Sequence, residues 1–502
     1  MIFLTYKYQN KMKNNIVILL LAMVVFSCTP LEEMNINPNL PTETHPQLLL
    51  TNVEWEVFRA YGGTSPLYAQ KMLVQTDGEN ANQYYKWDRG SYGPYSVLRN
   101  VTKMIEEAER ISNPSYVALG KFFRSYYFFN LTLNFGDVPY SAALKGEKEE
   151  GYAPEYDEQK EVFKGVLKEL EEAEMILAAQ NTIIAGDIIY AGNVLSWRKL
   201  INAFRLKVLM TLSTKSGTTD IDFSEFNFIY TSSPLMKSES ESGQLVFLDQ
   251  QNNRYPDFNS SGFSSGMYMD STFIQRLQDR KDPRLFIYST QTKSAKEAGK
   301  AIDDFSAYEG GDPAAPYGQV NEKATKGNVS RVNDRYHRDP VNEPYKLLGY
   351  SEQQLILAEA AVRGWISADA KMLYEEGVKA SFKFYETYSE EYSSYVDSEA
   401  AMKYLSEAKN DFSKATTMEQ KIELIVMQKY LQSFFQLQWT SFYDHHRTGY
   451  PTFRRPAGVQ IPYRWIYPQS EYNFNADNVS AAITEQFGPG NDNIHQMTWW
   501  IE

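Results

Sequence analysis

Residues 416–444 read TTMEQKIELIVMQKYLQSFFQLQWTSFYD, and this stretch predicts a long helix. Thr416 and Glu419 have the spacing of a capping box, in which two side chains satisfy free N–H groups at the start of a helix. Apolar residues then recur at helical spacing and define an inner stripe: Leu424, Met427, Leu431, Phe434 and Phe442. It is the clearest helix in a chain that we expect to be mainly α-helical.

Further helices are predicted on both sides of the middle of the chain. Residues 122–129 are rich in aromatic side chains, and we expect their helix to be buried on several sides. Three other early segments carry apolar stripes: Leu98, Val101, Ile105 and Ala108; Val162, Val166, Leu170, Ala173 and Leu177; and Trp197, Leu200, Ile201, Phe204 and Val208. Helices resume at Ser351, with the stripe Leu355, Ala358, Val362 and Trp365, continued by Leu373, Val378 and Phe382.

Residues 214–345 differ from the helical segments in composition, being rich in Gly, Ser, Asn, Asp, Pro and Tyr. We expect a loop-rich lobe with a few short strands, inserted into a helical scaffold of residues 47–213 and 346–445. Residues 446–502 are predicted to be irregular. No strict repeat of about 30–40 residues is visible, but paired helices of that size suit a degenerate solenoid. We therefore predict a single domain over residues 47–502.

The N-terminal residues have the pattern of an export signal. Lys11 and Lys13 precede an apolar run at residues 16–26. This run is too short to span a bilayer but has the length of a signal-peptide core. Ser27-Cys28 then resembles a bacterial lipobox, in which the cysteine becomes the acylated N-terminus. Ordinary signal cleavage nearby, with a free thiol, is the alternative.

We therefore expect a lipoprotein signal peptide at residues 1–27 and a lipidated tether at residues 28–46, whose turn-forming sequence suits a linker. Translation could begin at Met1 or Met12. Acyl chains on one residue anchor a protein to a membrane without a spanning helix.

Composition excludes several classes of protein. The chain has 50 Lys and Arg against 63 Asp and Glu, a net charge of −13, which argues against nucleic acid as a partner. The mean hydropathy of −0.48 excludes a polytopic membrane protein. A single cysteine excludes an intrachain disulfide and a cysteine-based zinc cluster. The 36 Tyr, 28 Phe and 8 Trp favour a wet binding surface, because Tyr and Trp combine an apolar face with a polar group.

No motif in the sequence predicts catalysis or a cofactor. Gly262–Gly266 fits the nucleophile elbow of serine hydrolases, but the polar residues before it do not form the required strand. His445 and His446 are adjacent and lack the spacing of a zinc site, so we expect them to pack structurally at a helix end. Among 63 acidic residues a catalytic carboxylate pair remains open, as in an exported glycoside hydrolase.

Short motifs occur throughout the chain. In chain order they are Asn35-Ile36-Asn37-Pro38-Asn39, Gly136-Asp137-Val138-Pro139-Tyr140, Asp187 with Tyr190, Gly192 and Trp197, Asp282-Pro283-Arg284, Ala358-Glu359-Ala360, Gln428-Lys429, Arg447-Thr448-Gly449-Tyr450-Pro451, Pro462-Tyr463-Arg464, Tyr467-Pro468, Asn491-Asp492 and Trp499-Trp500. Together they resemble the SusD/RagB family of outer-membrane nutrient-binding lipoproteins. The resemblance covers roughly residues 28–502 and is closest in the C-terminal third.

The resemblance implies a scaffold of tetratricopeptide-like helix pairs with loops on the other side. It also implies a non-catalytic external lid of a TonB-dependent (SusC-like) transporter, which captures a glycan or, in some members, a peptide. Glu32 and Glu33 resemble the surface-export signal of Bacteroidota lipoproteins, which implies an outer-membrane protein facing the cell exterior. We expect the motifs themselves to be structural, with Arg447 and Arg464 holding carboxylates or carbonyls beneath them.

The early loop at residues 77–95 is the first candidate for ligand binding. Sugar recognition needs flat apolar faces together with amide or carboxylate partners for the hydroxyl groups. Trp87 is the strongest candidate, because its charged neighbours indicate a solvent-facing loop; a buried turn is the alternative. The segment supplies Asp77, Asn80, Asn82, Tyr84, Tyr85, Trp87, Asp88, Tyr92 and Tyr95.

Two further clusters offer similar chemistry. The second comprises Asn252, Asn253, Arg254, Tyr255, Phe258 and Tyr268, and the third comprises Tyr308, Tyr317, Tyr336 and Arg338. Three functions stay open at this point: a nutrient-binding lipoprotein for a glycan or a peptide, an exported glycoside hydrolase, and a structural scaffold at the cell surface.

Overall fold

The computed structural model describes residues 43–60, 62–146, 151–263 and 266–502, and residues 46–502 form one compact unit. The predicted signal peptide, Cys28, the tether up to residue 42, and Ser264 of the elbow-like motif lie outside the described residues.

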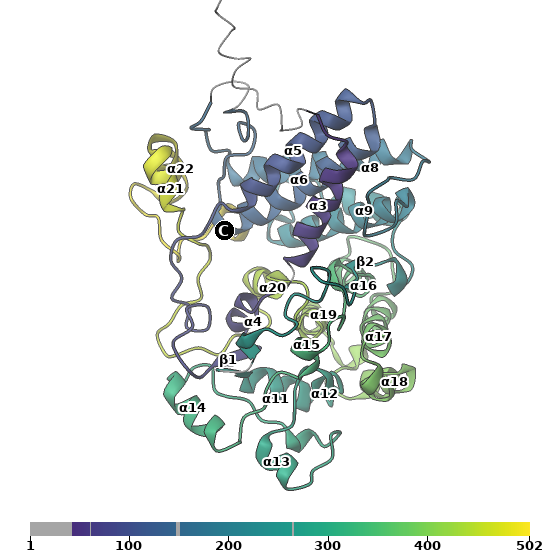
Figure 1. Cartoon of the computed structure of the whole chain (residues 1–502), viewed down its shortest axis with the longest axis vertical. Helices are drawn as coiled ribbons and strands as arrows, with labels where there is room; N and C mark the ends of the chain where they lie inside the picture. Colours follow the sequence, from purple (N-terminus) through teal and green to yellow (C-terminus); the bar gives the residue numbers. More distant parts are fainter. Residues whose placement is uncertain (1–42, 61, 147–150, 264–265) are drawn as a thin grey trace, which may run out of the picture. The chain divides into compact units, whose positions relative to one another are not determined.

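The first half of the unit is a set of packed helices (Figure 1). Helix α5 packs on α3 and α6, α6 packs on α8, and α8 packs on α9. Local sequence sets the ends of α6: the Asn113 side chain accepts a hydrogen bond from Ser115 N, and Gly136 follows with φ of 93°. The helices are α3 (Pro46–Arg59), α5 (Pro94–Arg110), α6 (Pro114–Phe135), α8 (Gln159–Ala178) and α9 (Val194–Thr211).

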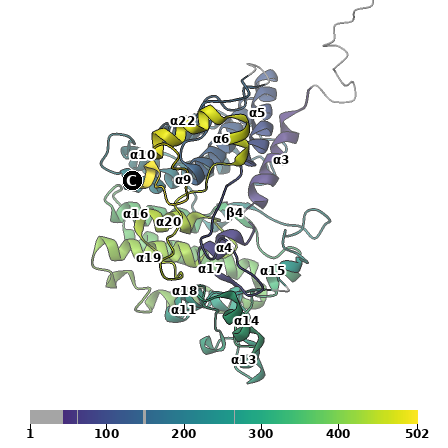
Figure 2. The ribbon, with the colours of Figure 1, turned by 90° about the vertical axis from the view of Figure 1, so that its left-hand side faces the viewer.

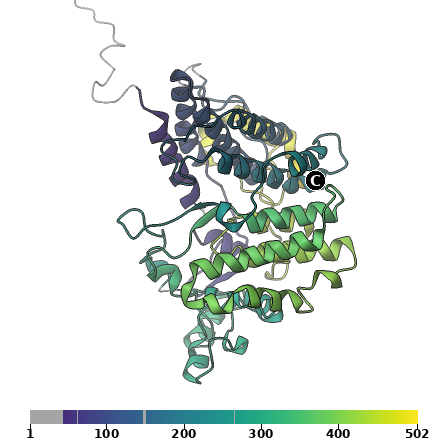
Figure 3. The same cartoon turned by 90° about the vertical axis from the view of Figure 1, so that its right-hand side faces the viewer.

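A second helical group follows later in the chain. Helix α16 packs on α17, α19 and α9, so it joins the two groups. Figure 3 shows α16 to α19 in green, stacked side by side. The group comprises α16 (Tyr350–Val362), α17 (Ala370–Tyr388), α18 (Ser398–Ser406), α19 (Met418–Leu431) and α20 (Thr440–Thr448). The expected mainly α-helical fold is confirmed.

Between these groups the chain contains short helices and two small antiparallel sheets. Strand β1 (Leu73–Gln75) pairs with β3 (Met267–Met269), Val74 lying opposite Tyr268. Strand β2 (Gly243–Leu245) pairs with β4 (Tyr345–Leu348). The remaining α-helices up to β4 are α4 (Ser65–Ala69), α10 (Ser224–Ser232), α11 (Ser271–Asp279), α12 (Arg284–Tyr288), α13 (Lys293–Glu297), α14 (Tyr317–Thr325) and α15 (Arg335–Arg338).

Short 3₁₀ helices complete the described secondary structure: Leu212–Lys215, Glu239–Glu241, Ser261–Phe263, Phe305–Ala307, Glu390–Tyr395, Phe412–Lys414 and Trp499–Ile501. Within the described part of the chain, none of the helices combines the length and the apolar character needed to cross a bilayer.

The C-terminal segment is more regular than the sequence predicts. It contains α21 (Gln469–Phe474) and α22 (Ala476–Phe487), so the prediction of an irregular chain over residues 446–502 is wrong there. Only three side chains of α22 are buried, Val479, Ala482 and Ile483, which is too short a stripe to be recognised in the sequence. Figure 2 shows α22 lying near α6, and the Gln486 side chain accepts a hydrogen bond of 2.8 Å from Asp137 N.

The start of α19 also differs from the prediction by one residue. Thr417, not Thr416, is the N-cap; its side chain accepts a hydrogen bond from Gln420 N, and the Gln420 side chain completes the capping box. Thr416 with Glu419 and Thr417 with Gln420 have the same spacing, so the sequence offered both. The helix then ends at Leu431, and the rest of the stripe lies in the following turn and in α20.

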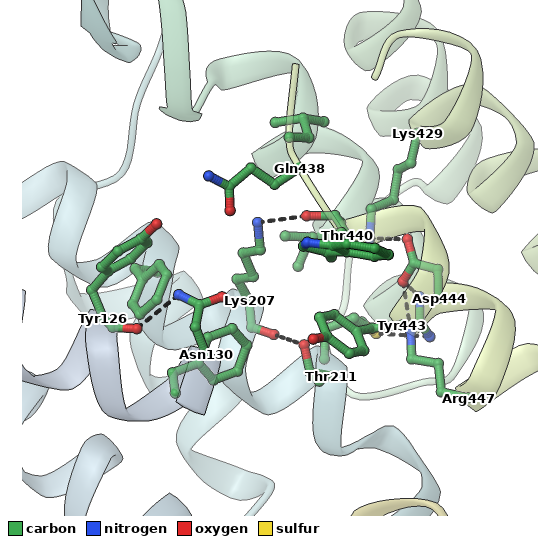
Figure 4. A pocket seen from close by; sticks show the side chains of 16 residues that line it. Tyr126, Asn130, Lys207, Thr211, Lys429, Gln438, Thr440, Tyr443, Asp444 and Arg447 are labelled. Carbon is green, nitrogen blue, oxygen red and sulfur yellow. Dashed lines mark hydrogen bonds and ion pairs between the residues drawn. The ribbon is translucent and has the colours of Figure 1, made fainter. Parts of the chain in front are cut away.

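Buried charges connect three helices of the second group, α16, α19 and α20. Arg447 on α20 forms two hydrogen bonds with Glu359 on α16, of 2.5 and 2.7 Å. It also contacts Asp444 at 2.7 Å (Figure 4). Asp444 pairs with Lys429 on α19 at 2.7 Å, and Arg363 pairs with Glu359 at 2.8 Å. We call these five residues the ion-pair network.

Electrostatics keep the network ionised. Burial alone would raise the pKa of Glu359, but Arg447 and Arg363 outweigh it and hold this pKa below its ordinary value. The same balance, with Lys429 and Arg447 as partners, lowers the pKa of Asp444. Lys207 on α9 extends the connection, because its ammonium group lies 3.0 Å from Glu352 on α16 and 3.0 Å from the Thr440 hydroxyl.

The predicted role of the two motif arginines is confirmed. Arg447 holds two carboxylates. Arg464 is fully buried, pairs with Asp492 at 2.6 Å and donates to the carbonyl oxygen of Phe135 at 2.9 Å. Both guanidinium groups therefore join segments that are distant in the sequence.

We predict that Glu359→Gln strongly destabilises the protein. The substitution leaves the buried Arg447 and Arg363 without their shared carboxylate, and breaking a buried ion pair in this way costs about 3–5 kcal/mol. Urea unfolding measures the change. Asp334→Asn is the matched control, because its partner Arg338 is largely exposed and such pairs contribute little. Equal stability of the two variants would contradict the role given to the network.

Candidate functional site

The early loop after β1 folds back through its own polar side chains. The Asn80 side chain accepts hydrogen bonds from Asn82 N and Gln83 N, at 3.0 and 3.1 Å, which closes a turn. Tyr84 then donates to the carbonyl oxygen of Ala315 at 2.8 Å. This hydrogen bond joins the first candidate cluster to residues 312–317, a segment that ends at Tyr317 of the third cluster.

Trp87 lies in the interior, so the expected solvent-facing position is wrong. Its side chain is 7% exposed and stacks on Trp465, with ring centroids 3.8 Å apart, and it also contacts Trp439 and Phe442. The backbone explains the error: Gly90 N donates to the carbonyl oxygen of Ile466, which holds the segment extended. Side chains alternate in such a segment, so Trp87 points inward although its neighbours are exposed.

Two other expected ligand contacts are also buried. Tyr85 is 3% exposed, donates to the carbonyl oxygen of Ala69 and has the Lys71 ammonium group 3.9 Å from its ring centre. Tyr255 is 1% exposed and packs against Phe247 and Tyr345. Burial raises the pKa of both hydroxyl groups well above the ordinary value. Neither ring presents a free face for a sugar.

The polar candidates separate into two places. Asp77 and half-buried Asn82 lie in the loop after β1, where the backbone of Gly266 on the β3 side approaches Asp77 closely. Asn253 and Arg254 are exposed in another loop, where Arg254 pairs with Asp249 at 2.6 Å. That second loop is held by residues 337–340, since Tyr255 N donates to the carbonyl oxygen of Pro340.

The third cluster contains both buried and exposed side chains. Tyr308 and Tyr336 are buried, and Arg338 is exposed and paired with Asp334 at 3.3 Å. Tyr317 is 39% exposed and lies at the start of α14. Tyr84 is 8% exposed and therefore about as buried as Trp87, so of these two tyrosines only Tyr317 supplies aromatic surface to the region around residues 312–317.

The sequence did not reveal the most open charged feature near this region. A cleft of about 530 Å³ lies between α11 and the segment after α20, lined by Thr272, Arg276 and residues 452–459. Arg454 pairs with Asp312 through two hydrogen bonds, of 2.7 and 2.6 Å, which brings this segment beside α14 (Figure 1). The cleft therefore adjoins residues 312–317, which end at Tyr317 and accept the hydrogen bond from Tyr84. We call it the arginine cleft.

A buried pair of charges lies behind the arginine cleft. Asp270 caps α11 by accepting hydrogen bonds from Thr272 N and Phe273 N. Burial raises the pKa of its carboxyl group, against the opposing effect of the Thr272 hydrogen bonds and of Lys71. Burial likewise lowers the pKa of Lys71, partly countered by Asp270.

Two other cavities fit a ligand less well. The cavity in Figure 4, between α6, α9 and α20, has about 30 Å³ of free space, enough for roughly one water molecule. In a cleft of about 570 Å³ beside α9 and α16, two of the lining polar side chains, Lys199 and Gln353, are already paired within the protein. There, Lys199 pairs with Glu241 at 2.5 Å, and the Gln353 amide bonds both backbone groups of Met236.

The adjacent histidines pack against the structure, as expected. His445 lies 2.8 Å from the carbonyl oxygen of Pro451, and the His446 ring contacts Phe442 and Tyr463. Burial lowers the pKa of His445 to about 4 and that of His446 to about 3. Within the described ranges no group of three or more His, Cys, Asp or Glu side chains is arranged to hold a metal ion.

Comparison with known proteins identifies the family. A SusD-like family model, described as starch-binding and associating with the outer membrane, matches residues 38–468. The chain belongs to the SusD-like family. The resemblance seen in the sequence is therefore confirmed.

Solved structures agree with the SusD-like assignment. A SusD homologue from Bacteroides fragilis is 57% identical, covering 92% of this chain and 100% of its own, with a TM-score of 0.88. A candidate nutrient-binding outer-membrane protein from Bacteroides vulgatus is 53% identical, with 91% and 100% covered and a TM-score of 0.88. A chitin-binding SusD homologue from Flavobacterium johnsoniae, 18% identical with 91% and 99% covered and a TM-score of 0.69, shares the fold. No curated protein matches the chain.

Motif residues of this SusD-like protein support the scaffold. The Asp187 carboxylate accepts hydrogen bonds from Tyr190 N, Gly192 N and the indole N–H of Trp197. Arg284 and Asp282 form a fully buried pair at 2.6 Å. These motif groups are therefore satisfied inside the protein.

We predict that Trp87→Ala lowers the free energy of unfolding by about 3–5 kcal/mol, because it removes a buried indole that stacks on Trp465. Urea unfolding provides the measurement. Lys86→Ala is the control, since this neighbouring side chain is exposed and pairs only with exposed Glu79. A Trp87→Ala protein of unchanged stability that no longer binds glycans would instead place the indole in the ligand site.

Proposed function

We propose that this SusD-like protein is a non-catalytic, cell-surface nutrient-binding protein that captures an oligosaccharide. The main support is the family match over residues 38–468, together with 57% identity to a SusD homologue over 92% of the chain. The family is described as starch-binding, and a distant relative of the same fold is described as chitin-binding.

The region around residues 312–317 supplies the ligand contacts in this proposal. Asp77 and Asn82 offer polar groups for hydroxyls, and Tyr317 offers accessible aromatic surface. Tyr84 is 8% exposed and joins the two segments through its hydrogen bond to Ala315. Trp87, Tyr85 and Tyr255 act behind the surface, as support. Asn253 and Arg254 remain a second, separate candidate patch, because both are exposed and lie beside the half-buried ring of Phe258.

Attachment and delivery complete the proposal. Acylation of Cys28 anchors the protein in the outer membrane, facing the exterior, and the captured oligomer passes to a TonB-dependent transporter. In cells, Cys28→Ala is then expected to release the protein from the membrane fraction and to reduce uptake of the oligomer. Unchanged attachment would contradict the lipid anchor.

Binding without turnover is the expected outcome for the purified full chain. Calorimetry against a panel of neutral and acidic oligosaccharides measures affinity, and chromatography of the same mixtures measures cleavage. Binding of at least one oligosaccharide with all chains intact supports the proposal. Cleavage supports a glycoside hydrolase, binding of peptides alone supports a peptide-binding member, and failure to bind any oligomer supports a structural scaffold.

A further inference from the structure

The arginine cleft contains more positive charge than its surroundings neutralise. Three guanidinium groups line it, those of Arg276, Arg454 and Arg455. Only Arg454 has a carboxylate partner among the described residues, namely Asp312. Three positive charges against one negative charge leave about two unbalanced, in a chain whose net charge is −13.

Arg276 is held in place without being neutralised. Its guanidinium group packs over the Tyr430 ring, 5.0 Å from the ring centre, and donates to the carbonyl oxygen of Thr452. Its Nη1 atom is buried and has no hydrogen-bond partner within the described structure. A buried donor without a hydrogen-bond partner is costly, so this N–H group is suited to donate a hydrogen bond to an anion.

Arg455 is preorganised in a different way. Its Nε donates to the carbonyl oxygen of Val459 at 2.8 Å and its Nη1 to that of Phe453 at 3.1 Å. Carbonyl oxygens orient a guanidinium group but do not cancel its charge. The side chain is exposed, so an anion in the cleft can reach its remaining donors.

The aromatic surface of the proposed glycan site adjoins this charge. Asp312, which binds Arg454, begins the loop that accepts the Tyr84 hydroxyl at Ala315 and ends at Tyr317. One sugar polymer can therefore contact the Tyr317 ring and the guanidinium groups together. A volume of about 530 Å³ lies in the range of pockets that hold small ligands.

We propose that the arginine cleft binds the carboxylate of a uronate residue in an acidic oligosaccharide. The inference rests on the proposed function and adds the charge of the ligand to it. Arginine forms paired hydrogen bonds with planar carboxylates, which neutral sugars lack. A glycan is favoured over an acidic peptide by the accessible ring of Tyr317 and by the starch-binding description of the family.

Calorimetry of the full chain with matched charged and neutral oligomers tests this inference. The probes are oligogalacturonate and its methyl ester, with oligomannuronate and oligoglucuronate as further acidic probes, each at low and high salt. We expect at least one acidic oligomer to bind tenfold or more tightly than methyl-esterified oligogalacturonate, with affinity falling as salt rises.

Substitutions locate the charge that matters. Arg455→Gln and Arg276→Gln are each expected to weaken binding of the acidic oligomer about tenfold. Lys168→Gln on α8 is the control, because it removes the same charge from a side chain that is 75% exposed and forms only a weak surface pair. Because Arg455 is exposed, it can be replaced without disturbing the core, so the inference can still be tested if Arg276→Gln unfolds the protein. Circular dichroism shows whether each variant is folded.

The possible outcomes separate this inference from the proposed function. Tight binding of neutral glycans with no preference for acidic ones would overturn the inference and leave the proposed function standing. Equal effects of Arg455→Gln and Lys168→Gln would also overturn it. Binding of a glutamate-rich peptide in place of any glycan, or no binding at all, would overturn both.

Discussion

The pairing of Glu359 with Arg447 is the interaction on which the arrangement of this protein depends. Both side chains are almost completely buried, so each would lose much of its hydration without the other. Arg363, Asp444 and Lys429 join them, which ties α16, α19 and α20 to one another. Packing of apolar stripes brings such helices together, but satisfying buried charges restricts them to one relative position.

This restriction extends to the candidate ligand surface. Helix α20 carries Arg447 and ends at Thr448; the following Gly449, with φ of 81°, turns the chain toward residues 452–459. The same helix carries Phe442, which packs with Trp439 against the buried face of Trp87 and so supports the early loop. One anchored helix therefore positions both the arginine cleft and the loop that leads to Tyr84. A binding surface supported in this way needs little reorganisation when a ligand arrives.

The sequence predicts the features of this protein that depend on local pattern. Apolar stripes predicted the helices α5, α8, α9 and α17, and the order of short motifs predicted the family. The structural role of the motif arginines could also be predicted, because a guanidinium group in the protein interior needs a hydrogen-bond partner. The observed capping box begins one residue later than predicted, because the adjacent threonines Thr416 and Thr417 have the same spacing to a suitable partner.

Features that depend on distant residues could not be predicted. Trp87 has charged neighbours, but Trp465, far along the chain, covers it. The arginine cleft combines Arg276 of α11 with Arg454 and Arg455 after α20, and no single stretch contains all three. The adjacent pair Arg454-Arg455, followed by Pro456 and Gly458, was a local sign of an exposed basic turn. Helices as short as α11 and α22 bury too few side chains for a visible stripe.

In the proposed function, a helical frame fixed by buried charges offers a preformed ligand surface, at residues 312–317 and 452–459. A crystal structure of the full chain with a bound oligosaccharide tests this claim most directly. We expect the sugar across Tyr317 and toward the arginine cleft, with the ion-pair network and the two segments unmoved. A sugar bound elsewhere, or a surface formed only by rearranging these segments, would contradict the claim.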